Sequence, residues 1–119
     1  MAVTASQVVA TIPIAQTLTT VSGTVGTGLG TIIAAPGSAV EVIGYDVQLQ
    51  LWAGTAAVTT YLKAGSVAVR SLYAASAGDG LIFVPPPGAE LHFGANTPVV
   101  LDVSSGTVAY TLRYGTAAV

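Results

Sequence analysis

Hydrophobic and polar residues alternate along most of the chain with a period of two, which is the period of a half-buried β-strand. Valine, threonine, isoleucine and tyrosine are frequent, and glycine and proline recur between the alternating runs. The first group favours strands and the second favours turns, and no window shows the 3.6-residue period of a helix. The pattern predicts an all-β protein, a jelly-roll-like β-sandwich of about eight strands with an extended N-terminal arm.

The longest alternating run, Val40–Trp52, changes phase part-way along. Val42 lies on one parity, whereas Val47 and Leu49 lie on the other. Because a slip of one residue moves every later side chain to the opposite face, the run predicts a β-bulge at Ile43-Gly44. The acidic and amide side chains of the run then share the outer face: Glu41, Asp46, Gln48 and Gln50.

Two further alternating runs, Val99–Val103 and Val108–Tyr114, lie on either side of Ser105-Gly106. A two-residue turn at Ser105-Gly106 would set Val103 opposite Val108 and pair the apolar positions of both runs. The pattern therefore predicts a C-terminal β-hairpin, with a loop of three or four residues as the alternative.

The first 28 residues differ from the rest, because they carry no charge and end in a stretch rich in glycine, threonine and serine. We expect two parts: an extended arm or linker over residues 1–28 and a β-sandwich domain over residues 29–119. Val8–Ile14 could add a strand to the sheet edge of a neighbouring chain, or it could be an edge strand of the chain's own sandwich. The arm residues expected to bind a partner are Val8, Val9, Ile12 and Ile14.

Charge is scarce: 7% of the residues are charged and the net charge is −2, against about 25% charged residues in ordinary soluble domains. Mean hydropathy is +0.75, but the apolar runs are far shorter than the roughly 18 residues that span a bilayer, so no membrane association is expected. Three basic residues provide no footprint for nucleic acid. Surface positions rich in threonine, serine and glutamine indicate contact with other protein chains, or a surface that is merely uncharged.

Residues for catalysis or metal binding are sparse. The chain has no cysteine and one histidine, and its five acidic residues form no short motif, so neither a zinc nor a calcium site is expected. His92 falls at an outward strand position, where a surface or interface role is the more common one. Gly23–Gly30 is rich in glycine but lacks the Lys-Ser/Thr of a phosphate loop. We therefore expect no enzyme activity and no cofactor.

The aromatic residues divide into two groups. Trp52, Tyr61 and Tyr73 lie near strand or turn ends, where exposed rings could anchor a protein interface or stack on a sugar. The second group lies on the inward parity of the alternation and is therefore expected in the core: Tyr45, Tyr110 and Tyr114.

The segment from Pro87 to Tyr114 resembles the ending of many small virion proteins of tailed phages. In it, Gly88-Ala89-Glu90-Leu91-His92-Phe93 leads through a Ser/Gly turn to a last strand, Thr107–Tyr114, which ends in an aromatic residue. The family is the jelly-roll head decoration (cement) proteins, with head-fibre bases close to it. The resemblance implies a homo-oligomer, most often a trimer, on the capsid surface of the virion, where it binds the major capsid protein.

These features predict a structural virion protein that stabilises a phage head as a capsid decoration protein. One alternative is a receptor- or glycan-binding jelly-roll module of a phage tail or fibre, and another is a tail structural protein. The chain lacks an evident charged patch, so the sequence leaves the docking surface open.

Overall fold

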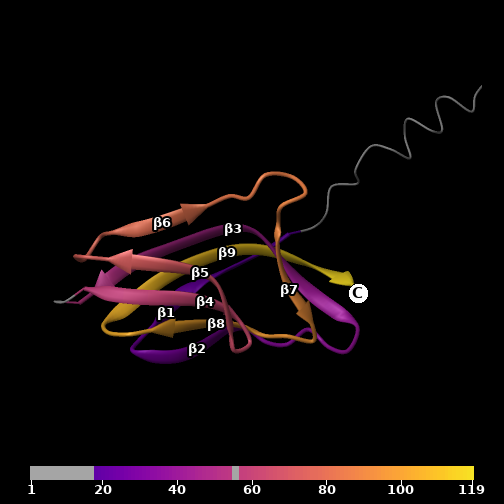
Figure 1. Ribbon diagram of the computed structural model, residues 1–119, viewed down its shortest axis with the longest axis horizontal. Helices are drawn as coiled ribbons and strands as arrows, with labels where there is room; N and C mark the ends of the chain where they lie inside the picture. The colour runs from indigo at the N-terminus through magenta and orange to yellow at the C-terminus, as the bar shows by residue number, and fades with distance from the viewer. Residues whose placement is uncertain (1–17, 55–56) are drawn as a thin grey trace, which may run out of the picture.

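The computed structural model describes residues 18–54 and 57–119, which form a sandwich of two antiparallel sheets (Figure 1). Sheet A has the strand order β1-β9-β3-β6, with β7 also paired to β3, and sheet B has the order β2-β8-β4-β5. The nine strands of the described residues are β1 (Thr19–Val25), β2 (Gly28–Ile33), β3 (Val40–Ala53), β4 (Val58–Ala64), β5 (Val67–Ala74), β6 (Gly80–Phe83), β7 (Leu91–Ala95), β8 (Val99–Val103) and β9 (Thr107–Ala118).

Strands β6 and β7 share one place in sheet A. Strand β6 pairs with β3 along Val47–Gln50, and β7 pairs with β3 along Glu41–Gly44. If β6 and β7 are counted as one interrupted strand, β8 becomes the seventh strand and β9 the eighth. The strand order is then 1-8-3-6 in sheet A and 2-7-4-5 in sheet B, which is the arrangement of a jelly roll. The predicted all-β, jelly-roll-like sandwich is confirmed.

Three prolines explain the interruption between β6 and β7. Pro85, Pro86 and Pro87 have no backbone N–H to give to a sheet, so β6 ends before them. The amide of Ala89 donates a 2.9 Å hydrogen bond to the carbonyl of Pro86. Gly88 has a φ of +88°, so Pro87-Gly88 forms the centre of a type II turn.

The core lies between the inner faces of the two sheets and consists of aliphatic side chains at alternate strand positions. In β3, Val42 and Val47 both point inward, because the register with β9 shifts between Gly44 and Asp46. The predicted bulge is present, centred on Tyr45 rather than Ile43-Gly44. The largest fully buried apolar side chains are Leu51, Leu62, Leu101, Leu112, Val42, Val47, Val58, Val99, Val103 and Val108.

The predicted C-terminal hairpin is wrong. Strand β8 pairs with β2 and β4 in sheet B, whereas β9 pairs with β1 and β3 in sheet A. The connection Ser104–Gly106 crosses from one sheet to the other, a distance of about 10 Å. Alternation specifies which face of a strand is buried. A hairpin within one sheet and a crossing between two sheets bury the same faces of β8 and β9, so the alternation does not distinguish the hairpin from the crossing.

The sandwich begins earlier than the predicted residue 29. Strand β1, within the range assigned to the arm, pairs with β9 over all of Thr19–Val25. Although the segment is rich in glycine, it forms a strand because its valines point inward, and Val21 and Val25 pack against the core. The predicted partner-binding residues Val8, Val9, Ile12 and Ile14 lie outside the described residues.

Candidate interaction surfaces

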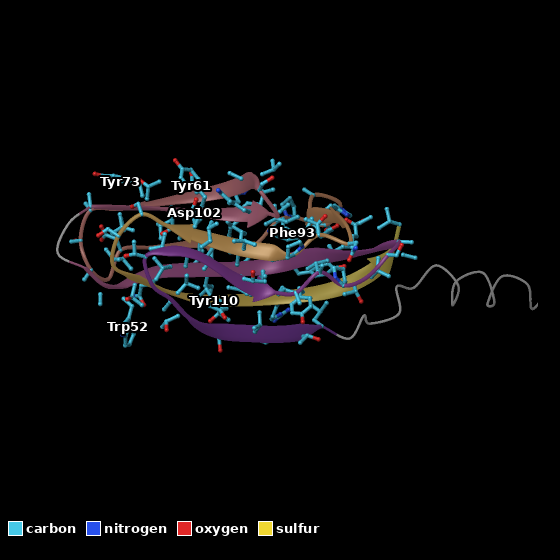
Figure 2. All side chains as sticks on the ribbon, turned by 90° about the horizontal axis from the view of Figure 1, so that it is seen from below. Trp52, Tyr61, Tyr73, Phe93, Asp102 and Tyr110 are labelled. Carbon is cyan, nitrogen blue, oxygen red and sulfur yellow. The ribbon has the colours of Figure 1, made fainter. Side chains whose placement is uncertain are left out.

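The outer face of sheet B carries three large exposed side chains from three strands. Tyr61 on β4 is 40% exposed, Tyr73 on β5 is 69% exposed and Leu29 on β2 is 71% exposed. Tyr61 lies opposite Ser71, so Tyr73 is its diagonal neighbour across β4 and β5, within reach of an aromatic side chain. Figure 2 shows both tyrosines projecting from the same side of the sandwich. We call Leu29, Tyr61 and Tyr73 the sheet B patch.

A single ion pair lies inside the sheet B patch. Asp102 on β8 is the register partner of both Leu29 and Tyr61. Its carboxylate lies 2.9 Å from the ammonium of Lys63, with the two side chains 34% and 21% exposed. The two charges therefore compensate each other, and the patch presents apolar and hydroxyl groups around a neutral pair.

The outer face of sheet A is different in character along β1, β9 and β3, where short hydroxyl and amide side chains predominate. Its outward positions form cross-strand rows such as Ser22, Thr111 and Gln48. A shallow hollow of about 430 Å³ lies over β3, β6 and β9, with Gln48, Gln50 and Ile82 among its lining residues. The hollow forms where β6 contributes Gly80 opposite Gln50, a position without a side chain.

The aromatic residues predicted to be exposed are exposed, but they do not form one cluster. Trp52 is 66% exposed and occupies a register shift between Leu51 and Ala53. Figure 2 shows it on the opposite side of the sandwich from Tyr61 and Tyr73. The structure thus brings together two of the three residues.

The remaining tyrosines differ in their burial. Tyr110 and Tyr114 are partly buried against the core, as predicted. Tyr45 is half-buried at the bulge and is not part of the core cluster. The sequence did not single out Leu29, although it shares the outward parity of Thr31 two residues later, which is the signal that could have identified it.

His92 is held by an acid on the neighbouring strand. Its Nδ1 lies 3.2 Å from the Glu41 carboxylate, with the His92 side chain 55% exposed. The pair joins β7 to β3 at outward positions of sheet A. The pair therefore links two neighbouring strands at the surface of the sheet.

Asp79 organises a turn instead of a ligand site. Its carboxylate accepts hydrogen bonds of 3.0 Å from the amide of Ala75 and 3.1 Å from the amide of Ser76. Within residues 18–54 and 57–119, no group of three or more metal-ligating side chains lies together. No helix in the same residues is long and apolar enough to cross a membrane.

Comparison with known proteins identifies no family. No protein-family model matches the chain, and no curated protein matches it. One similar solved structure is of a protein from Bacillus endospore appendages, which are disulfide-linked pili; it is 21% identical over 83% of this chain and 85% of that chain, with a TM-score of 0.45. Similarity at this level extends to neither family nor function, and this chain has no cysteine for a disulfide link.

Proposed function

We propose that this domain is a structural subunit of a protein assembly and works by binding neighbouring chains, without catalysis. The observation that carries the proposal is the sheet B patch, where Leu29, Tyr61 and Tyr73 stand exposed on one face of the sheet. Exposed aromatic and aliphatic side chains around a compensated ion pair are typical of a protein interface, in which uncompensated charge is depleted.

The finer form of the proposal is decoration of a phage capsid. It is supported by the resemblance of Pro87–Tyr114 to the ending of head decoration proteins and by the low charge of the chain. In this form a homo-oligomer, most often a trimer, binds the major capsid protein. Because it binds only the assembled shell, it stabilises that shell by mass action.

The first experiment measures the mass of the full chain in solution by light scattering after a sizing column. We expect a discrete oligomer. Replacing Leu29 or Tyr73 with threonine should preserve the strands, because threonine favours them and both positions are exposed. Each change should weaken association by about tenfold or more, since a central apolar anchor contributes roughly 1–2 kcal/mol or more to binding.

Ile82→Thr is the matched control, because Ile82 is 72% exposed on sheet A and lies outside the patch. We expect it to leave the mass unchanged. A chain that is monomeric at all concentrations and binds no expanded phage capsid would contradict the proposal. Equal effects of Tyr73→Thr and Ile82→Thr would remove the sheet B patch as its basis.

A second candidate function, sugar binding, is favoured by one observation: Tyr61 is the register partner of Asp102, and Tyr73 lies diagonally across from Tyr61 on β5. Aromatic faces stack on the apolar face of a sugar ring, and a carboxylate accepts hydrogen bonds from its hydroxyls. Titration calorimetry with an array of oligosaccharides tests this alternative. Binding that is lost in Tyr73→Thr would favour it, and the absence of heat with any sugar would exclude it.

A further inference from the structure

The edge strands of the sandwich differ in how well they are protected from pairing with other chains. Natural sheets protect their edges with short strands, prolines, bulges or inward-pointing charges. Strand β5 has a register shift and an inward charge, Arg70, whose guanidinium lies 4.2 Å from the centre of the Phe83 ring. Strand β6 has four residues and precedes three prolines, and β2 has a register shift between Thr31 and Ile33.

Strand β1 has none of these protective features. It has seven residues, Thr-Thr-Val-Ser-Gly-Thr-Val, with no charge and no proline. Its register with β9 is unbroken from Thr19 to Val25. Within the described residues, β9 is its sole pairing partner, so one row of its backbone N–H and C=O groups faces outward at the edge of sheet A (Figure 2, lower edge).

We propose that β1 pairs antiparallel with β1 of a second copy, about a two-fold axis at Ser22. This inference rests on the general form of the proposed function, a structural subunit that binds neighbouring chains, and names one of its interfaces. A strand of seven residues pairs along its whole length with itself only when its middle residue lies on the axis, and Ser22 is that residue. The pairing joins two copies of sheet A into one continuous sheet, as in an isologous dimer.

The side chains of β1 fit this register on the outer face. Thr20, Ser22 and Thr24 point outward. In the proposed pairing Thr20 faces Thr24 of the second copy, and the two Ser22 side chains face each other. Every outward position therefore sets a hydroxyl opposite a hydroxyl, a combination that stabilises cross-strand pairs.

The inward positions of β1 also fit. Val21 would face Gly23 of the second copy. The Tyr110 ring already lies over Gly23, since a Cβ there would be 3.0 Å from the tyrosine hydroxyl oxygen. Val21 would therefore pack beside this half-buried ring and remove more of it from water.

The nearest charges do not oppose the pairing. Arg113 lies one strand inside the edge, as the register partner of Thr20. The two-fold axis offsets the two Arg113 residues by about four residues along the strands and by three strand spacings across them, roughly 20 Å in all. At that separation their repulsion is largely screened at physiological salt.

A single-cysteine experiment tests the edge directly, because the natural chain has no cysteine. In the proposed dimer the two Cα atoms at position 22 lie about 4.5–5.5 Å apart, within the range that a disulfide bridges. The Ser22→Cys chain should therefore form a disulfide-linked dimer under mild oxidation, measured on a non-reducing gel. Thr111→Cys is the control, since Thr111 is the register partner of Ser22 on β9 and its two copies would lie about 14 Å apart.

We expect at least about tenfold more cross-linked dimer with Ser22→Cys than with Thr111→Cys, because the control distance exceeds disulfide reach. A mixture of Thr20→Cys and Thr24→Cys should cross-link between the two variants, which fixes the register. Equal yields at positions 22 and 111, or no dimer at 22, would overturn the proposal. So would preferential cross-linking of Ser22→Cys to Ile12→Cys, which would assign the edge to the N-terminal segment.

The mass of reduced Ser22→Cys separates this proposal from the proposed function. An oligomer by light scattering that forms no disulfide at position 22 would overturn the β1 pairing and leave the assembly function in place. A monomer that forms no disulfide would overturn the β1 pairing, and it would overturn the assembly function as well if it also binds no expanded phage capsid.

Discussion

Thr60 is a polar residue in the apolar core and offers the sharpest test of the packing. It is fully buried on β4, with its side chain on the inner face of sheet B. Its register partners are Val103 and Leu72, both of which are buried core residues. Within the described residues, its hydroxyl oxygen has no hydrogen-bond partner.

Thr60→Val replaces this hydroxyl with a methyl group and keeps the branched shape of the side chain. Burying a hydroxyl without a partner costs about 1–3 kcal/mol, and the new methyl group adds apolar burial. We therefore expect the free energy of unfolding to rise by about 1–2 kcal/mol. For a domain of about 100 residues, this raises the Tm by roughly 4–8 °C.

Urea denaturation followed by circular dichroism measures the change in unfolding free energy, provided that the slope m stays constant. Thr59→Val is the matched control on the same strand, because Thr59 is half-buried on the outer face. Its effect should remain within about 0.5 kcal/mol. A Thr60→Val protein that is no more stable than the natural chain would refute the reasoning and show that the hydroxyl makes a hydrogen bond in solution.

Two further predictions concern the turn and the core. Gly106→Ala should destabilise the sandwich by more than about 2 kcal/mol. The reason is that Gly106 has a φ of +76° and that a Cβ there would lie 2.3 Å from the carbonyl oxygen of Ala53. A variant with the thermal stability of the natural chain would contradict the observed crossing between sheets. Leu101→Ala should lower the free energy of unfolding by about 2–5 kcal/mol, because Leu101 is fully buried. Leu29→Ala, at an exposed position, should lower it by less than about 1 kcal/mol. Chemical denaturation of both variants gives the comparison.

Residue parity predicted much of the fold. The positions of Val47, Leu49 and Leu51 on the inner face follow directly from their alternation with amides, and the structure buries all three. Asp79 also acts locally, since its carboxylate accepts hydrogen bonds from the amides of Ala75 and Ser76, four and three residues earlier. These features depend on neighbouring residues, so a local pattern contains enough information to predict them.

Strand neighbours could not be predicted in the same way. Val103 and Val108 have matching parity, yet they belong to different sheets. The exposed pair Tyr61 and Tyr73 shows the same limit, because their proximity depends on the register of β4 with β5, which includes a bulge. The regular strand β1 could not be predicted either, because its glycine lowers the β-propensity of the segment. Pairing with β9, which is distant in sequence, stabilises it as a strand.

Strand β9 lies between β1 and β3, although more than eighty residues of sequence separate β1 from β9. During synthesis, β1 and β3 leave the ribosome long before the strand that joins them, so sheet A cannot close until β9 has emerged. Strand β8 likewise joins β2 to β4 in sheet B, and only three residues separate it from β9. Both sheets of the sandwich are therefore completed by the last two strands, so the face rich in hydroxyl and amide groups forms only after nearly all of the domain has been synthesised.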